Sequence, residues 1–397
     1  MTECFPRNGE SFLYGGMNMV ITVVADVLGK ANNGTTITIL RLIESLKARG
    51  HEVRVVSPTP VKEEGFYCLP RRNFFIFNEY LEKNGVELAK PDRETLESAI
   101  VGADVVHIAL PFRTGRAARD IAEENGIPVT SAFHCQPENI TSHLGRGVMN
   151  MKFVSDGIYR HFYKKFYREI GFVHCPSEMI RKELVGHGYG MDLRVISNGV
   201  EDAFFDGDDR PPRGGTVNIL FTGRLVREKR HDLLIDAVAE SRHESEIQLY
   251  FAGTGPLRRK LEKRAEKLSN PPVFGFYPQS ELISLIKEMT FYVHPSDVEI
   301  EAISCLEAIS CGLVPIISDS PRSATNAFAL SGHNLFRAGD ARSLAEKIDF
   351  MIEHPEERNA LREQYRGYAE NFRISRCIDR MEDMFRDAIR AKGGEAV

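Results

Sequence analysis

Short apolar runs alternate with longer amphipathic stretches along most of the chain. The short runs are rich in β-branched residues, and each stretch that follows repeats its apolar residues at helical spacing. This alternation is typical of βαβ units, in which helices cover both faces of a buried parallel sheet. In the first half, the pattern predicts strands and helices at 20–24, 36–48, 53–56, 104–108, 114–124 and 129–132. In the second half, it predicts them at 217–221, 231–241, 247–252, 257–268, 292–294, 304–310 and 314–317, with one continuous charged helix from residue 356.

The alternation is interrupted at residues 201–215, where five acids, a Pro-Pro pair and three glycines occur without periodicity. Such a composition is typical of a linker. We therefore predict an α/β protein with two doubly wound, Rossmann-like domains at 18–200 and 216–375. We expect residues 1–17 to be an N-terminal extension, and 376–397 to be a C-terminal helix and tail.

Composition narrows the class of protein. A length of 397 residues fits two domains of about 150 residues or more. Seven scattered cysteines without a C-x-x-C pair argue against a disulfide framework or zinc site and predict a cytoplasmic protein. The net charge of −5 combines +1 over residues 1–200 with −6 over the remainder, which does not indicate nucleic-acid binding. The most apolar early run, 17–28, is shorter than the roughly 20 residues that a membrane-spanning helix needs.

In open α/β sheets, ligands bind at the carboxyl ends of the strands, so loops after strands are the candidate sites. The first such loop, Gly29–Gly34, has small residues at a helix start, which suits a phosphate. It lacks both the dinucleotide and the Walker fingerprints. A tight turn with Thr35 or Thr36 as helix cap is the alternative.

A second loop, after the strand at 217–221, carries Gly223, Arg224 and Lys229. Two cations at a strand end suit a diphosphate, because arginine can bind oxygens in a bidentate way and lysine adds a point charge. A solvated helix start is the alternative. A third loop, Gly253–Pro256, is compatible with a simple turn.

The most specific segment is 294–312, which places Glu299 and Glu307 eight residues apart around a helix start. Carboxylates accept pairs of hydrogen bonds from the hydroxyl groups of sugars and ribose. A helix start also offers free backbone N–H groups. The alternative is one capping and one exposed glutamate.

Together these motifs resemble the family 4 retaining glycosyltransferases of the GT-B fold. The matching elements are an E-x7-E motif (Glu299 and Glu307), G-R-x4-K (Gly223, Arg224 and Lys229), G-x-G-P (Gly253–Pro256), N-G-V (Asn198–Val200) and P-S-E (Pro176–Glu178). The resemblance covers roughly residues 18–375. It implies two domains that face each other across a cleft, with the C-terminal helix returning to the first domain.

The resemblance also implies a nucleotide-diphosphate sugar donor such as UDP-glucose, with no cofactor or metal. Arg224 and Lys229 would neutralise the diphosphate, Glu307 would hold the ribose and Glu299 the sugar. His134 would lie near the anomeric carbon, which completes the catalytic set. The other donor-binding candidates are Gly34, Gly253, Gly255, Ile300, Glu301, Ala302 and Ile303. The family commonly has aromatic and glycine residues just after its first glutamate, so Glu301 and its neighbours leave the donor sugar open.

Residues 152–168 combine five Lys or Arg with six aromatic residues at near-helical spacing. Such a helix fits docking on an anionic membrane, whereas burial of its apolar stripe in the first domain is the alternative. The docking candidates are Arg160, Phe162, Lys164, Lys165, Phe166 and Arg168. This segment also resembles bacterial diacylglycerol glucosyltransferases, which implies a lipid acceptor and a peripheral position on the inner face of the cell membrane.

Other functions remain open at this point. The acceptor could be a soluble sugar phosphate or small glycoside, and a GT-B epimerase, phosphorylase or nucleotide-sugar-binding protein is a further alternative. No carboxylate nucleophile is recognised in the first domain, which favours front-side transfer. The Asp206–Asp208 string is interpreted as solvated. The sequence leaves the base, the sugar and the oligomeric state undetermined.

Overall fold

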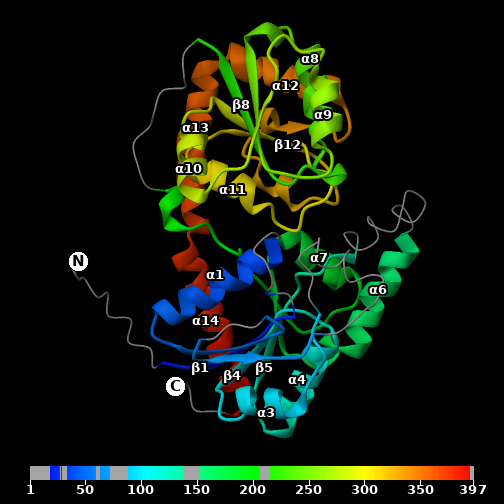
Figure 1. The fold of residues 1–397 in the computed structure, drawn as a ribbon, viewed down its shortest axis with the longest axis vertical. Helices are drawn as coiled ribbons and strands as arrows, with labels where there is room; N and C mark the ends of the chain where they lie inside the picture. Colours follow the sequence, from blue (N-terminus) through cyan, green and yellow to red (C-terminus); the bar gives the residue numbers. More distant parts are fainter. Residues whose placement is uncertain are drawn as a thin grey trace, which may run out of the picture.

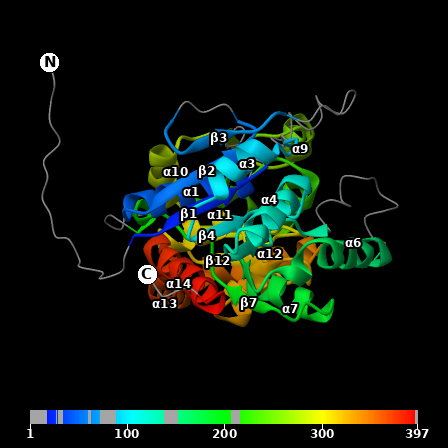
Figure 2. The ribbon, with the colours of Figure 1, turned by 90° about the horizontal axis from the view of Figure 1, so that it is seen from below.

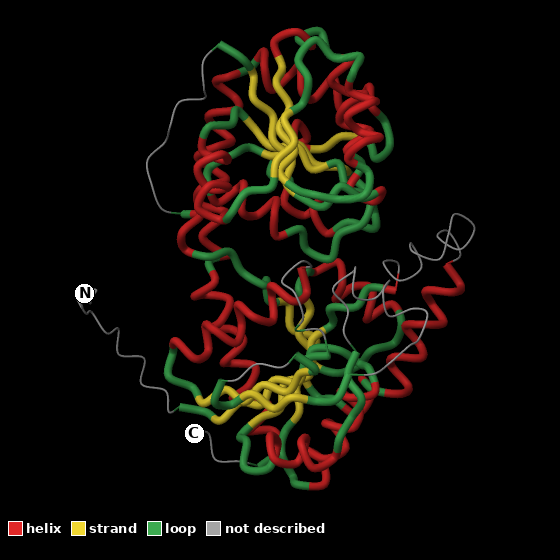
Figure 3. Tube along the Cα trace, in the orientation of Figure 1, coloured by secondary structure: helices red, strands yellow, loops and turns green. Residues whose placement is uncertain are grey.

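The computed structural model describes residues 18–26, 28, 34–59, 63–71, 88–137, 152–205 and 215–393. The predicted N-terminal extension, most of the Gly29–Gly34 loop and the Asp206–Asp208 string lie outside these residues. Figure 1 shows two lobes stacked along the long axis, and Figure 3 shows a sheet at the centre of each lobe with helices around it.

The first lobe is built on a parallel sheet with the strand order β3-β2-β1-β4-β5-β6-β7. Its strands are β1 (Val20–Val24), β2 (Glu52–Ser57), β3 (Phe66–Cys68), β4 (Val105–Ile108), β5 (Val129–Ala132), β6 (Phe172–Cys175) and β7 (Asp192–Val195). Its helices are α1 (Gly34–Ala48), α3 (Arg93–Ile100), α4 (Arg113–Glu124), α6 (Lys152–Lys165) and α7 (Glu178–Gly186). The order reverses between β1 and β4, which makes this a doubly wound sheet.

The side chains of β1 alternate between two apolar clusters, one on each face of the first sheet. Ile21 and Val23 pack with α1, whereas Val24 packs in the cluster that holds the buried side chains of α3, α4, α6 and α7. Burial on both faces explains why these strands appear as continuous apolar runs in the sequence.

The second lobe has a parallel sheet in the order β10-β9-β8-β11-β12-β13. Its strands are β8 (Val217–Thr222), β9 (Ile247–Ala252), β10 (Val273–Gly275), β11 (Phe291–His294), β12 (Pro315–Ser318) and β13 (Leu335–Phe336). Its helices are α8 (His231–Glu240), α9 (Arg258–Ala265), α10 (Gln279–Lys287), α11 (Ile303–Ser310), α12 (Ala341–Glu353) and α13 (Pro355–Ala369). Here the order reverses between β8 and β11, so the loops after these two strands flank the switch point where ligands bind in such sheets.

The chain passes between the lobes twice, and the two crossings run side by side. Val200 and Arg373 form a parallel bridge, with Val200 N–H donating to the Phe372 carbonyl and Ile374 N–H donating to the Val200 carbonyl. The prediction of one continuous helix from residue 356 is therefore wrong. The chain becomes extended at Arg373 (ψ 134°) to make this crossing, and α14 (Ile374–Ala391) begins directly after it.

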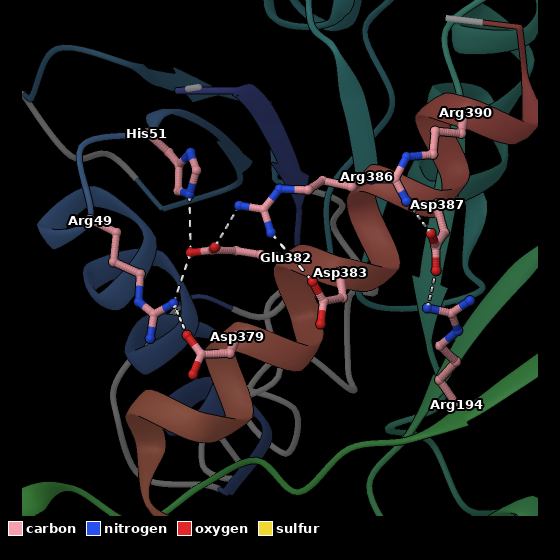
Figure 4. A network of polar contacts seen from close by, with 9 residues as sticks. All are labelled: Arg49, His51, Arg194, Asp379, Glu382, Asp383, Arg386, Asp387 and Arg390. Carbon is pink, nitrogen blue, oxygen red and sulfur yellow. Dashed lines mark hydrogen bonds and ion pairs between the residues drawn. The ribbon is translucent and has the colours of Figure 1, made fainter. Parts of the chain in front are cut away.

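Helix α14 returns to the first lobe, as expected, and buries its apolar face against α1 and the first sheet. Figure 4 shows its polar side chains joined to that lobe by ion pairs. Glu382 is central, because it pairs with Arg49 at 3.0 Å and His51 at 3.2 Å. Burial tends to raise the pKa of Glu382, but these two partners outweigh burial and lower it to about 2. Among the described residues, no helix is long and apolar enough to cross a membrane.

Candidate functional site

The loop after β8 carries two of the predicted donor-binding cations. Gly223 follows the strand at a φ of +154°, and the chain then passes Arg224 before a short 3-10 turn at Arg227–Lys229. The Arg224 side chain is 46% exposed and lies 3.9 Å from Glu228, whereas Lys229 is largely buried. One loop therefore offers both an accessible guanidinium and a fixed ammonium group.

Lys229 meets the first motif glutamate. Its ammonium group forms a short ion pair with Glu299, which follows β11, and Glu299 also hydrogen-bonds His294 Nε2 at 3.0 Å. Burial tends to raise the pKa of Glu299, but the charge of Lys229 and the contact with His294 hold it well below its usual range. The structure thus brings Lys229 and Glu299 together across the switch point between β8 and β11.

His294 extends this contact into the core. It is fully buried, and its Nδ1 lies 3.2 Å from the Tyr292 hydroxyl, which in turn lies 3.0 Å from Thr222 Oγ1. Burial lowers the pKa of His294, so the ring is neutral, with Nε2–H donating to Glu299 and Nδ1 accepting from Tyr292. This hydrogen-bond chain fixes the position of the Glu299 carboxylate.

The second motif glutamate, Glu307, lies on α11 and contacts the first lobe. Arg41 of α1 donates to Glu307 at 3.2 Å and also pairs with Glu201 at 2.6 Å, beside the crossing between the lobes. Burial raises the pKa of Glu307 against the opposing charge of Arg41. The predicted ribose-binding carboxylate is therefore engaged by an arginine of the opposite lobe.

The loop between the two glutamates ends at Ala302, which has a left-handed conformation (φ 64°) and caps α11. Ile303 is the first residue of that helix, so the predicted N–H donors at 300–303 do lie at a helix start. The Glu301 side chain is buried and binds Asn198 of the interdomain crossing, and the Ile300 carbonyl accepts from Ser177.

The predicted donor-loop glycines allow two loops to pack closely. A Cβ on Gly253 would lie 1.9 Å from the Gly223 carbonyl oxygen, and one on Gly255 would lie 2.5 Å from that of Leu225. The loops after β8 and β9 are also hydrogen-bonded, with Leu225 N–H donating to the Thr254 carbonyl at 2.9 Å. Gly253 and Gly255 are therefore needed to position the loop that carries Arg224 and Lys229.

The carboxyl edge of the first sheet contains three buried histidines, His107, His134 and His174. The rings of His134 and His174 lie 5.5 Å apart, and burial lowers the pKa of all three side chains. They line one cavity together with residues of α1, α14 and the crossing, including Asn198. The predicted catalytic His134 is thus a neutral side chain in a mostly apolar cavity. Gly34 begins α1, and a Cβ there would meet open space.

The predicted docking helix α6 is divided into two faces. Phe162 and Phe166 are buried in the core of the first lobe, as the alternative interpretation expected, so the structure does not place these two on the surface. The exposed side chains include Phe153 (64% exposed), His161 and three cations of α6, Arg160, Lys164 and Lys165, and Arg168 is exposed in the short turn that follows. Figure 2 shows α6 at the outer edge of the first lobe.

Some residues at these edges were missed by the sequence analysis. Asp26 follows β1 at the carboxyl edge of the first sheet, is 3% exposed, and has a pKa raised to about 6 by burial. Its Oδ1 has no hydrogen-bond partner among the described residues. The first domain therefore holds a carboxyl group at its ligand edge that the sequence analysis did not single out, and the expectation that it supplies no carboxylate nucleophile stays a prediction. The position of Asp26 two residues after a strand was the available signal. His294 was visible as the strand end before Glu299, but nothing in the sequence marks Arg41.

Two families cover most of the chain. Residues 208–368 match the family described as Glycosyl transferases group 1, and residues 32–204 match Glycosyltransferase Family 4. Alpha-monoglucosyldiacylglycerol synthase of Streptococcus pneumoniae is 24% identical over 76% of this chain and 72% of its own length. A GDP-mannose-dependent alpha-mannosyltransferase of Mycolicibacterium smegmatis is 26% identical over 76% of this chain and 79% of its own.

A solved sucrose-phosphate synthase from Thermosynechococcus elongatus superposes with a TM-score of 0.72. It covers 94% of this chain and 100% of its own, at 16% identity, which shows a shared fold. The matching families and the shared fold point to the same family as the motifs that the structure places at the switch point. The chain belongs to the family 4 glycosyltransferases and has the GT-B fold.

Proposed function

We propose that this enzyme transfers a hexose from a nucleotide-diphosphate sugar to a lipid hydroxyl, such as that of diacylglycerol, with retention of anomeric configuration. The observation that supports this most is the Lys229–Glu299 pair beside Arg224 at the switch point of the second sheet. It combines cations for a diphosphate with an ionised carboxylate for sugar hydroxyls. UDP-glucose is the proposed donor.

In the proposed reaction, the bond between the anomeric carbon and the β-phosphate oxygen breaks as the acceptor oxygen bonds to the same face. The acceptor proton passes to the departing phosphate. Negative charge grows on that phosphate, and Arg224, Lys229 and the N–H groups at the start of α11 would stabilise it. These fixed groups make a metal ion unnecessary in this proposal.

Helix α6 supports a lipid acceptor. Its exposed cations would be attracted to the anionic inner face of a membrane, with a contribution of about 1 kcal/mol for each charge near the surface. Phe153 adds an exposed apolar side chain to the same helix. The Streptococcus pneumoniae relative is named alpha-monoglucosyldiacylglycerol synthase, and we extend a lipid acceptor of that class to this chain.

The experiment is to incubate the protein with UDP-glucose or GDP-mannose in vesicles that contain diacylglycerol. We expect nucleoside diphosphate release together with a glycolipid of retained configuration, and UDP-glucose as the better donor. Release only with soluble sugar phosphates would favour a soluble acceptor. Release of free sugar without any acceptor would favour the epimerase alternative.

Membrane docking has its own test. The triple variant Lys164→Ala, Lys165→Ala, Arg168→Ala should bind vesicles with anionic lipid roughly 100-fold more weakly than wild type, from the sum of three charges. The matched control replaces three exposed cations of α9, Arg258, Arg259 and Lys260, by alanine. Equal flotation of wild type and both triple variants would contradict docking through α6.

A further inference from the structure

Helix α11 and the loop before it are held by the first lobe at three points. Ser177 Oγ donates to the Ile300 carbonyl at 2.6 Å, Asn198 binds the Glu301 carboxylate, and Arg41 binds Glu307. All three contacts lie within residues 300–307, between and including positions proposed to bind the donor. The donor side of the second lobe is therefore in direct contact with the first lobe.

Of these three contacts, the one between Glu301 and Asn198 has the most hydrogen bonds. Asn198 N–H lies 3.2 and 3.1 Å from the two carboxylate oxygens, and Asn198 Nδ2 donates to Oε2 at 2.6 Å. The carboxylate is only 4% exposed, so little water can replace these donors. Loss of a buried hydrogen-bonded partner leaves the remaining groups unsatisfied, which is costly.

Asn198 lies at the junction between the two lobes. It immediately precedes Gly199 and Val200, the crossing that pairs with residues 372–374. A Cβ on Gly199 would lie 2.9 Å from the Ile374 backbone, so the crossing is tightly packed against the start of α14. Asn198 also lines the cavity that contains His134. The Glu301 side chain, which hydrogen-bonds Asn198, is therefore held at the junction of the two lobes.

We propose that Glu301 is a positioning residue that ties the donor loop, 299–303, to the interdomain crossing at Asn198. The loop then keeps its donor-binding form only while the two lobes hold their mutual arrangement. This inference rests on the proposed donor site. It assigns to Glu301 a function in holding the loop, whereas the family resemblance had placed this residue beside the sugar.

Hydrogen–deuterium exchange of the full chain without donor tests the contact directly. Glu301→Ala should speed amide exchange in 197–200 and 299–304 by roughly tenfold, as expected for loss of a buried hydrogen-bonded acceptor. Glu301→Gln should stay closer to wild type, because its amide oxygen still accepts from Asn198 N–H. The control is Glu346→Gln, an exposed glutamate of α12. Unchanged exchange in Glu301→Ala overturns the proposal.

Faster exchange throughout β1 and β8 would mean that Glu301→Ala has lost its fold, and Asn198→Asp then decides. Burial raises the pKa of Glu301 to about 7, so at about pH 8.5 that variant sets two carboxylates against each other and should speed exchange in the same two segments. If it leaves them unchanged, the proposal is overturned.

A kinetic measurement separates this inference from the proposed function. In an active enzyme, Glu301→Ala should raise the donor KM about tenfold with a smaller change in kcat, and Glu301→Gln should largely restore it. Faster loop exchange with an unchanged donor KM would overturn the link to donor binding. If wild type transfers sugar from no donor, the proposed function fails, while the exchange experiment still decides whether Glu301 holds the loop.

Discussion

The two sheet edges that face each other in this molecule use opposite chemistry. The edge of the second sheet holds Lys229 and Glu299 as a buried ion pair, with Arg224 exposed beside them. The edge of the first sheet holds neutral histidines that line a mostly apolar cavity, and a buried carboxyl group, Asp26. Fixed charges suit a charged, leaving diphosphate, and a less charged edge suits the lipid hydroxyl that we propose as acceptor. The contrast is therefore consistent with the proposal that the second lobe binds the donor and the first lobe the acceptor.

The largest expected effect comes from removing the buried cation of the charged edge. Lys229→Ala should lower kcat/KM by roughly 100- to 1,000-fold, by analogy with loss of one oxyanion-stabilising group. The control is Arg227→Ala, an exposed cation of the same turn, which should retain most of the activity. Steady-state kinetics with the donor varied provides the measurement. Near-normal kcat/KM in Lys229→Ala would show that the charged edge does not contribute to the reaction.

Replacing a histidine of the neutral edge should have a smaller effect on the rate. We expect His134→Gln to lower kcat by roughly 100-fold, the lower end of the range for a proton-transfer group at a reacting centre. His107→Gln is the matched control, because His107 lines the same cavity within β4. It should change the melting temperature more than kcat. Equal kcat losses in the two variants would mean that His134 acts through packing alone.

A network of charges in the first lobe lies in the contacts of α14, and there it should affect stability. The pKa of Glu382 is lowered from 4.5 to about 2, so its stabilising contribution is complete above about pH 4.5 and is lost as pH falls toward 2. We expect this contribution to be on the order of 2 kcal/mol. Urea unfolding between pH 6 and pH 3 measures it. Glu382→Gln should flatten the dependence, and an unchanged slope would contradict the assignment.

The smallest expected effect concerns metal ions. If Arg224, Lys229 and the helix start neutralise the diphosphate, a chelator such as EDTA should change the transfer rate less than about twofold. The control is to add excess Mg²⁺ after chelation and measure the rate again. A severe loss with EDTA that Mg²⁺ restores would show that the charged edge is incomplete without a cation.

The resemblance of the motifs predicted much of the second-lobe site, because its residues are close in sequence. Gly223, Arg224 and Lys229 share one loop, and Glu299 is followed by Glu307 within one strand–loop–helix unit. Residues that lie this close together in the chain keep a fixed spacing, which can be recognised in the sequence alone. The alternation of strands and helices likewise placed the elements for which it gave ranges to within about three residues, because both faces of each sheet are buried. Others, such as β3, α3 and α12, had no predicted range.

Contacts between distant segments were not predictable in this way. The division of α6 into buried phenylalanines and exposed cations depends on which face of the helix packs in the core, and its sequence allowed either outcome. The break at Arg373 was missed because its extended form is imposed by pairing with Val200. Asp26 was missed because the residues next to it in the sequence do not indicate that its side chain is buried or that its pKa is raised.

The sequence by itself determined the periodic burial of strands and helices, and the local spacing of the cations and carboxylates that we propose to bind a donor. Only the tertiary structure decided how the lobes meet. Glu301 to Asn198 and Arg41 to Glu307 each join residues more than one hundred positions apart. Such contacts depend on how the lobes pack after each has folded. Glu307 and Asn198 belong to motifs that the sequence shows, but no motif or periodicity identifies the residue that pairs with each of them.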